Sequence, residues 1–347
     1  MELSAYDVLT AAREHGFELA GIAAVDAGAV DFPRYMDWVE NGYAGRMSYL
    51  SDRRAAVRSD PRNLMASTRS ILCVGKLYNR AGVAEGIAKY AQGEDYHDFM
   101  RRDLERMVAA LQKVQPFEAR ICVDTAPLLE RSLARQAGLG WIGKNTCLIN
   151  QQQGSWFLLA EVLLSLELTA NPEPPPDRCG SCTRCIDACP TRAIVPDGAN
   201  GWTLDARACI SYFTIELKGP VPEEYRASVG NNIFGCDICQ DVCPWNRRAP
   251  ETSAGEFFTF PDASLGDLLN LDAPEFRLRF EGTPVSRARY TGFLRNVLVA
   301  AGNSGDQSLR EPVLRILESS TEEIVREHAI WALRQLDGSG GGSGSVD

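Results

Sequence analysis

Two cysteine motifs in the middle of the chain restrict its fold more than any other feature. The first is C-x2-C-x2-C-x3-C-P, beginning at Cys179, and the second is C-x2-C-x3-C-P, beginning at Cys236. The first spacing is typical of two-cluster ferredoxins, in which three thiolates bind one [4Fe-4S] cluster and the fourth reaches its neighbour. The second motif lacks one cysteine, which Cys209 can supply. The sequence therefore predicts two clusters, one held by Cys179, Cys182, Cys185 and Cys243 and the other by Cys189, Cys209, Cys236 and Cys239.

Zinc is the alternative occupant of these motifs, because C-x2-C pairs also bind zinc. The spacing of the first motif favours clusters. The chain has 11 cysteines and no segment that resembles a secretory signal, so we expect reduced thiols and a cytoplasmic location. No run of apolar residues is long enough to predict a membrane span. Cys73, Cys122 and Cys147 stand alone among apolar residues, and we expect them in the core.

The pattern of apolar segments divides the 347 residues into three expected domains and a tail, a mixed α/β and α+β architecture. Residues 1–168 alternate helical and strand patterns, which indicates an N-terminal α/β domain that binds the cofactor. The proline-rich segment NPEPPPDR marks the next boundary, and residues 169–250 form the ferredoxin-like domain. Residues 251–337 have apolar positions every three or four residues, which is compatible with a HEAT-like helical domain. Residues 338–347 are rich in glycine and serine and look like an artificial linker.

Asp124 is the candidate for chemistry in the N-terminal domain. It directly follows the predicted strand ARICV (119–123), and ligands of α/β sheets bind at the carboxyl ends of strands. The alternative is that Asp124 or Thr125 caps the following helix, which the spacing alone favours. Two further sets have ordinary structural interpretations. They are a solvated helix face for Glu130, Arg131 and Arg135, and turns for Gly138, Gly140 and Gly143.

Five segments together resemble the epoxyqueuosine reductases, which complete queuosine synthesis in bacterial tRNA. They are VDTAPLLER, GWIGKNTCLI, CGSCTRCIDACPTRAI, SYFTIELKGPVP and GNNIFGCDICQDVCPWN, and the similarity runs from about Gly42 to Arg247. The resemblance implies an oxidoreductase that uses cobalamin and two [4Fe-4S] clusters to remove the epoxide oxygen of epoxyqueuosine at the wobble position of tRNA. It also implies an external one-electron donor such as a flavodoxin or ferredoxin. The chain's size and single-copy motifs are compatible with a monomer.

In that family the aspartate at the position of Asp124 is the proposed proton donor, so the resemblance favours catalysis over helix capping. The role requires a pKa of Asp124 raised by burial beside the cofactor and the base. The segment Asp95-Tyr96-His97 resembles the start of a cobalamin motif, but position 100 is Met where that motif has Gly, so we expect cobalt without an axial histidine. The residues expected to bind cobalamin are Arg58, Tyr96, His97, Asp124, Lys144, Asn145, Ser211 and Lys218.

Binding of tRNA has to be reconciled with a formal net charge of -10. Ten arginines in two groups are the candidates for phosphate contacts. They are Arg53, Arg54, Arg58, Arg62 and Arg69, and Arg277, Arg279, Arg287, Arg289 and Arg295. Tyr290 and Trp245 are candidates for stacking on unpaired bases, whereas the spacing of Phe293 indicates a core position. Two other functions stay open on the sequence: a cytoplasmic reductive dehalogenase-like corrinoid enzyme, and a non-catalytic ferredoxin-type electron-transfer protein.

Overall fold

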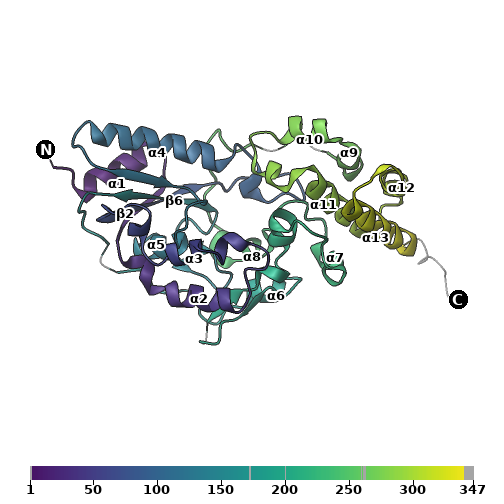
Figure 1. The fold of residues 1–347 in the computed structure, drawn as a ribbon, viewed down its shortest axis with the longest axis horizontal. Coiled ribbons are helices and arrows are strands. Elements are labelled where there is room, and N and C mark those ends of the chain that lie inside the picture. The colour runs from purple at the N-terminus through teal and green to yellow at the C-terminus, as the bar shows by residue number, and fades with distance from the viewer. Residues whose placement is uncertain (1, 172, 200, 259, 261–262, 340–347) are drawn as a thin grey trace.

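The computed structural model describes residues 2–171, 173–199, 201–258, 260 and 263–339. At the N-terminal end lies a four-stranded sheet with the order β1-β2-β6-β3, and at the other end a helical arm (Figure 1). All neighbouring strands in this sheet are antiparallel, so the predicted alternation of elements does not build parallel β-α-β units. The strands are β1 (Leu19–Ala24), β2 (Ser70–Leu77), β3 (Ala119–Cys122) and β6 (Phe157–Leu164).

Helices cover both faces of the sheet, because successive side chains of a strand point to opposite faces and the central strands are apolar on both. β2 is buried along its whole length. α1 and α4 cover the face that contains Leu72 and Val162, and α5 covers the face that contains Ile71 and Leu163 (Figure 1). The helices of this part are α1 (Ala5–Glu14), α2 (Phe32–Glu40), α3 (Arg54–Val57), α4 (Tyr96–Gln112) and α5 (Glu130–Gln136).

Local signals explain where several of these elements begin and turn. α1 begins after Ser4, whose hydroxyl and main chain form a capping box with Asp7. The hairpin of β4 (Trp141–Ile142) and β5 (Leu148–Ile149) needs a glycine at position 140, because a Cβ atom there would lie 2.2 Å from the main-chain oxygen of Ile149. Gly138 has φ +85°, so the structure supports turns and close packing for these glycines.

The cysteine-rich segment and the C-terminal helices share one hydrophobic core. That core joins Phe213 and Phe234 to Phe280, Phe293 and Leu336, and Phe293 is therefore buried as predicted. The limits predicted at residue 250 and the HEAT-like character stay predictions. The elements after the sheet are α6 (Arg184–Ala188), β7 (Ile194–Pro196), β8 (Trp202–Leu204), α7 (Glu223–Val229), α8 (Ile238–Asp241), α9 (Leu265–Asn270), α10 (Ala273–Phe280), α11 (Arg289–Ser304), α12 (Arg310–Ser319) and α13 (Glu323–Ser339).

Arg295 on α11 fastens the helical arm to the cysteine-rich segment, and the prediction that it contacts tRNA phosphate is wrong. Its exposed fraction is 1%, and its guanidinium donates hydrogen bonds to the main-chain oxygens of Phe213, Leu217 and Gly219. Burial lowers the pKa of Arg295 to about 10. Arg295 is therefore a buried tether, that is, a side chain that joins the helical arm to residues 213–219 of the cysteine-rich segment.

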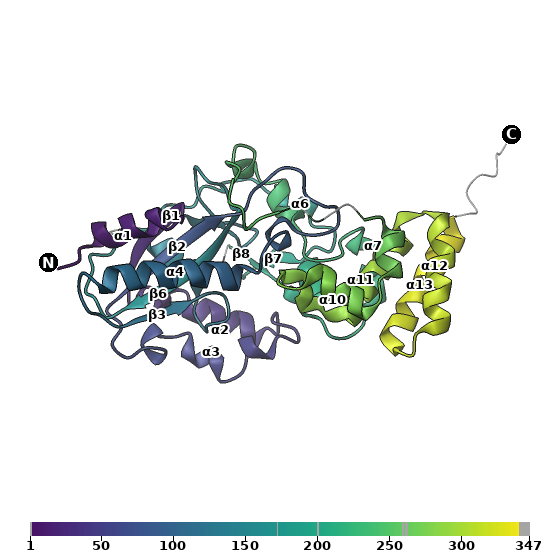
Figure 2. The same ribbon diagram turned by 90° about the horizontal axis from the view of Figure 1, so that it is seen from above.

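Figure 2 shows the arm from above, with α12 and α13 at the end away from the sheet. α13 continues to Ser339, so the first residues of the expected linker are helical, and residues 340–347 lie outside the described residues. None of the helices described here is long and apolar enough to cross a bilayer.

Candidate active site

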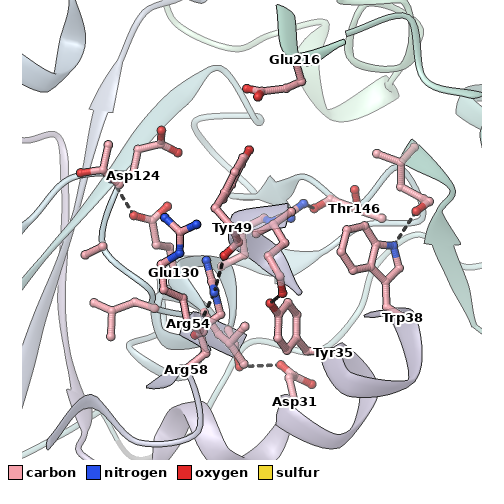
Figure 3. Close-up of a pocket in the computed structure, with 18 of the residues that line it drawn as sticks. Asp31, Tyr35, Trp38, Tyr49, Arg54, Arg58, Asp124, Glu130, Thr146 and Glu216 are labelled. Atoms are coloured by element: carbon pink, nitrogen blue, oxygen red, sulfur yellow. Dashed lines mark hydrogen bonds between the residues drawn. The ribbon is translucent and has the colours of Figure 1, made fainter. Parts of the chain in front are cut away.

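A cavity of about 880 Å³ lies where the three parts of the chain meet (Figure 3). Asp124 and Glu130 line it from the N-terminal domain, Glu216 from the cysteine-rich segment and Arg287 from the segment before α11. Its other lining side chains include apolar groups, tyrosines and several arginines. Among them are Tyr35, Tyr49, Arg54, Arg58, Tyr90, Tyr96, Leu128, Arg131, Ile142, Thr146 and Ile215.

Asp124 enters this cavity from a tight turn after β3. Its φ is 55°, in the left-handed region, and its main-chain N–H donates a hydrogen bond of 2.8 Å to Oε1 of Glu130 (Figure 3). α5 begins only at Glu130, and the residue that precedes it is Leu129, so neither Asp124 nor Thr125 caps the helix. The capping interpretation is wrong because the turn carries the chain past these residues before the helix starts.

His97 holds the carboxyl group of Asp124. Its Nε2 lies 3.1 Å from Oδ2 of Asp124, and its Nδ1 lies 2.7 Å from Oδ1 of Asp95. Arg287 adds a positive charge 3.7 Å from the same Oδ2 atom. The imidazole ring is stacked on Tyr96, with 4.1 Å between the ring centroids. Asp124 therefore lies between two cationic groups at the edge of the cavity.

These contacts lower the pKa of Asp124. Burial raises it, but the hydrogen bond from His97 and the charge of Arg287 outweigh burial, so the pKa lies below its usual value. The opposite holds for His97, where burial lowers the pKa but the two carboxylates raise it to about 9. The protonated Asp124 that the acid role requires when the substrate is bound stays a prediction. His97, with its pKa raised to about 9, is the protonated neighbour of Asp124 at neutral pH.

Glu130 is a site residue that the sequence did not reveal. Its spacing with Arg131 and Arg135 suggested a solvated face, but Glu130 lines the cavity, and burial and the charge of Asp124 raise its pKa to about 8. Arg135 forms an ion pair of 3.1 Å with Asp31. Burial also raises the pKa of Tyr49, to about 12. No local signal separates these residues from an ordinary amphipathic segment.

The residues predicted to bind cobalamin fall into two groups. Arg58, Tyr96 and Asp124 line the large cavity, and His97 reaches it through Asp124. The other four lie elsewhere. Lys144 and Asn145 line a second cavity beside the cysteines, Ser211 hydrogen-bonds the thiol of Cys209, and Lys218 is exposed and does not line the large cavity.

The second cavity, of about 260 Å³, is surrounded by thiols. Lys144 borders it and donates hydrogen bonds to the main-chain oxygens of Gly180 and Cys182, at 2.7 and 3.0 Å. Trp245 also borders it and packs edge-on against Trp141, which leaves its ring beside the thiols. The thiols around this cavity are those of Cys179, Cys182, Cys185 and Cys243. Four thiols around one hollow suit an iron–sulfur cluster.

The remaining motif cysteines gather behind this cavity. The thiols of Cys189, Cys209, Cys236 and Cys239 interact electrostatically with one another. Cys147 hydrogen-bonds Cys239, so it is not the isolated core cysteine that we expected, whereas Cys73 and Cys122 are buried as predicted. Residues 144–146 connect the two cavities, because Lys144 and Asn145 border the thiols and Thr146 borders the large cavity.

Most of the predicted tRNA-binding arginines are already engaged within the chain. Arg54 and Arg62 pair with Asp52 and Asp60, and Arg69 pairs with Glu167. Arg58 is buried beside the cavity, and Arg287 is part of the site. Tyr290 donates a hydrogen bond to the main-chain oxygen of Leu271. Three of the predicted arginines are exposed and form no ion pair with the described residues: Arg53, Arg277 and Arg289.

Comparisons with known proteins agree with this geometry. Residues 178–246 match the family described as "4Fe-4S double cluster binding domain", and residues 58–125 match "Epoxyqueuosine reductase QueG, DUF1730". The epoxyqueuosine reductase of Xanthomonas campestris is 42% identical over 94% of this chain and 95% of its own length. That of Pseudomonas aeruginosa is 40% identical over 93% of this chain and 92% of its own.

Solved structures show the same overall fold. A crystal structure of an epoxyqueuosine reductase with an epoxyqueuosine-modified tRNA-Tyr stem loop has a TM-score of 0.87 and 27% identity, covering 95% of this chain and 89% of that one. The structure from Bacillus subtilis, solved with its catalytic loop swung out of the active site, has a TM-score of 0.84 and 26% identity, covering 95% and 90%. Sequence identity, coverage and fold together show that this chain belongs to the epoxyqueuosine reductase family of oxidoreductases.

Proposed function

We propose that this chain reduces epoxyqueuosine to queuosine at the wobble position of tRNA, with cobalamin and two [4Fe-4S] clusters as cofactors. The observation that carries the proposal is the position of Asp124 and His97 at a large cavity that residues 144–146 connect to the motif cysteines. The reaction takes up two electrons and two protons, breaks both carbon–oxygen bonds of the epoxide and releases water. When bound, the clusters supply single electrons and the corrin supplies a low-valent cobalt centre.

The eight motif cysteines would hold the clusters in the crossed arrangement predicted from their spacing. Cys179, Cys182, Cys185 and Cys243 would bind the cluster nearer the surface, and Cys189, Cys209, Cys236 and Cys239 would bind the other. Lys144 supports this role in two ways. Its ammonium group neutralises charge beside the first set of cysteines, and its hydrogen bonds to Gly180 and Cys182 hold the loop that carries these cysteines. Asn145 donates a hydrogen bond to the main-chain oxygen of Cys239 and the next residue, Thr146, borders the large cavity, so electrons would pass from the second set into the active site along this segment.

The large cavity would hold cobalamin and the modified base. Its donors, among them Arg58, Arg131 and Tyr49, suit the amide and phosphate groups at the edge of a corrinoid, and its apolar side chains suit the ring. Among the residues that the structure describes, no histidine lines this cavity directly. His97 is occupied on both ring nitrogens by carboxylates, which supports cobalt bound without an axial histidine.

The proton that neutralises the epoxide oxygen would come from the pair of Asp124 and His97. His97 holds it on Nε2, 3.1 Å from Oδ2 of Asp124, and Asp124 extends into the cavity with 42% of its side chain exposed. As negative charge develops on the oxygen, Asp124 would take the proton from Nε2 of His97 and pass it to that oxygen, which leaves His97 neutral. Arg287, with its pKa raised, stays charged and stabilises the same oxygen.

The expected partners follow from this reaction. Exposed arginines such as Arg53, Arg277 and Arg289 would contact tRNA phosphates, which makes binding salt-dependent. A flavodoxin or ferredoxin would deliver electrons at the cysteine cavity, and we propose that the enzyme works as a monomer in the cytoplasm. Family membership argues against a reductive dehalogenase, and the proton-donating site argues against a pure electron carrier.

A single-turnover assay tests the proposal. The anaerobically loaded enzyme, reduced chemically, is mixed with an epoxyqueuosine-containing tRNA stem-loop, and the nucleosides are identified by mass spectrometry. We expect conversion to queuosine by the wild type and none by the Cys182→Ser control, which interrupts the electron path. Turnover of a halogenated aromatic compound without conversion of the tRNA would instead support the dehalogenase.

A further inference from the structure

Glu216 brings a carboxylate into the large cavity from the cysteine-rich segment. Four of the described acids line this cavity, and three of them have partners within the chain. The three are Asp31, which pairs with Arg135 at 3.1 Å, Asp124, which lies 3.1 Å from His97, and Glu130, which accepts the main-chain N–H of Asp124 at 2.8 Å. Glu216 forms no hydrogen bond or ion pair with any residue that the structure describes. Its carboxylate is therefore available to a ligand.

The arginines of the cavity do not neutralise Glu216, because they are held by other groups. Arg34, Arg54 and Arg287 pair with Asp197, Asp52 and Asp124, and Arg58 and Arg131 donate hydrogen bonds to the main-chain oxygens of Arg54 and Thr146. A wall with so many guanidinium groups attracts anions and repels cations. A cationic part of a ligand would therefore bind best beside Glu216.

A buried network fixes the main chain that carries Glu216. The residue ends the π-helical turn Tyr212–Glu216, which is closed by a hydrogen bond of 2.9 Å from the main-chain N–H of Leu217. Such turns are rare and occur frequently at functional sites. Arg295 donates a hydrogen bond of 2.7 Å to the main-chain oxygen of Leu217, and the buried Asn296 donates one to the main chain inside the turn. The turn therefore presents Glu216 to the cavity from a fixed base (Figure 3).

Tyr49 adds a second polar group to the same cavity. Its side chain is half-buried, and its hydroxyl has no hydrogen-bond partner in the part of the chain that the structure describes. Burial raises the pKa of Tyr49 to about 12, so the hydroxyl is neutral at neutral pH. Figure 3 shows this hydroxyl directed toward the side of the cavity from which Glu216 enters. The carboxylate and the phenol oxygen can accept two hydrogen bonds from one ligand group.

We propose that Glu216 and Tyr49 bind the secondary ammonium group of the modified base and so select tRNA that carries the modification over tRNA with guanine at the same position. The inference rests on the proposed function, which supplies the substrate. Epoxyqueuosine has an amine between its ring system and the carbocycle that bears the epoxide. A protonated dialkylamine has two N–H donors, one for the carboxylate of Glu216 and one for the oxygen of Tyr49. Queuosine keeps this amine, and guanine lacks it.

The test compares the binding of three tRNA stem-loops, none of which the enzyme reduces. Their wobble bases are queuosine, a 7-aminomethyl-7-deazaguanine that has the amine without the carbocycle, and guanine. The Kd of each is measured with the loaded enzyme, for the wild type, Glu216→Gln and Tyr49→Phe. Glu223→Gln is the matched control, because it removes the same charge from an exposed acid that does not line the cavity.

We expect the wild type to bind both amine-containing stem-loops more tightly than the guanine stem-loop. Glu216→Gln should weaken binding of these two about tenfold, as for the loss of a hydrogen bond between charged groups, and change binding of the guanine stem-loop less than about twofold. Tyr49→Phe should weaken the same two about threefold. Glu223→Gln should change all three by the same factor. Equal effects of Glu216→Gln on the three stem-loops, or a loss confined to the queuosine stem-loop, would overturn the inference.

Cofactor binding and kinetics separate this role from others. Glu216→Gln should bind corrinoid as the wild type does, and a loss of corrinoid with an unchanged preference among the stem-loops would assign Glu216 to the cofactor and overturn the inference. With the epoxyqueuosine stem-loop, Glu216→Gln should raise KM about tenfold and leave kcat nearly unchanged. A purely structural role would lower kcat and the yield of folded protein instead.

Failure of this inference and failure of the proposed reaction give different results. If the loaded wild type does not convert epoxyqueuosine, the reaction is refuted, but the three affinities still test Glu216 and Tyr49. If the wild type converts epoxyqueuosine but binds the three stem-loops equally well, the reaction stands and the inference is refuted. If Glu216→Gln fails to fold, Tyr49→Phe and the preference of the wild type decide the question.

Discussion

Replacing Asp124 by Asn should lower the pKa of His97, and the size of this change can be worked out from the site. The two carboxylates raise the pKa of His97 from 6.5 to about 9 against the effect of burial. This difference corresponds to about 3 kcal/mol in favour of the imidazolium. A free energy of this size is consistent with the His97 side chain, which is 16% exposed and lies within hydrogen-bond distance of a carboxylate at both ring nitrogens.

In Asp124→Asn the ring keeps Asp95, at 2.7 Å, but loses the charge at 3.1 Å. Arg287 then has no carboxylate opposite it and repels the imidazolium. We therefore expect the pKa of His97 to fall by at least about one unit, or ~1.4 kcal/mol. The measurement is an NMR titration of protein labelled with ¹⁵N-histidine, in which the chain's 3 histidines give few signals.

His328 is the internal control for this titration. It is buried in the helical arm, where burial lowers its pKa to about 4, and it does not contact Asp124. Its titration should be the same in both proteins. A pKa of His97 that stays near 9 in Asp124→Asn, or lies below neutrality in the wild type, would refute the assignment of the proton to His97.

The other predictions concern turnover, stability and tRNA binding. Asp124→Asn should leave iron and corrinoid content unchanged and abolish conversion of epoxyqueuosine in the single-turnover assay, and retained turnover would reject the acid role. The raised pKa of His97 stabilises the folded protein below pH 6.5, and this contribution of about 3 kcal/mol is lost as the pH rises through 9. Denaturant unfolding of His97→Gln should therefore depend less on pH over that range, and an unchanged dependence would contradict the ion pair. Arg295→Ala should lower the free energy of unfolding by about 3 kcal/mol or more, because it leaves buried carbonyls unpaired. The exposed control Arg277→Ala should change stability little and weaken tRNA binding in a salt-dependent manner, so equal stabilities of the two variants would count against the tether.

The cysteine sets could be predicted from the sequence because the ligands of an iron–sulfur cluster follow one another at short, characteristic spacings. Cys179, Cys182 and Cys185 are separated by only two residues each, so local chain geometry already brings their thiols together. The strands were predictable for a similar reason, since β2 and β6 are short apolar runs. Both signals are contained within a few consecutive residues.

The active site could not be predicted in the same way, because it depends on contacts between distant parts of the chain. Arg287 resembled an ordinary member of a basic segment, yet the packing of the arm brings it beside Asp124. Glu130 resembled part of a solvated helix face, yet it lines the cavity and accepts a hydrogen bond from the main chain of Asp124. His97 lowers the pKa of Asp124 through a contact between residues that are 27 positions apart in the chain, which local sequence patterns do not predict.

The antiparallel direction of the strands could not be predicted from the sequence either. An alternation of helical and strand patterns is compatible with parallel and antiparallel sheets alike. In this sheet β6, which comes last in the chain, lies between β2 and β3 and pairs with both in the antiparallel direction. Cys147 shows the same limit, since its neighbours in the sequence are apolar while its thiol contacts Cys239.

The metal and corrinoid content of protein purified without oxygen tests the central claim most directly. Iron, acid-labile sulfide, zinc and corrinoid are quantified together on the same sample. Two clusters predict about eight iron and about eight sulfide ions per chain, with one corrinoid bound after loading. Zinc in place of iron, in a colourless protein that binds no corrinoid, would contradict the account.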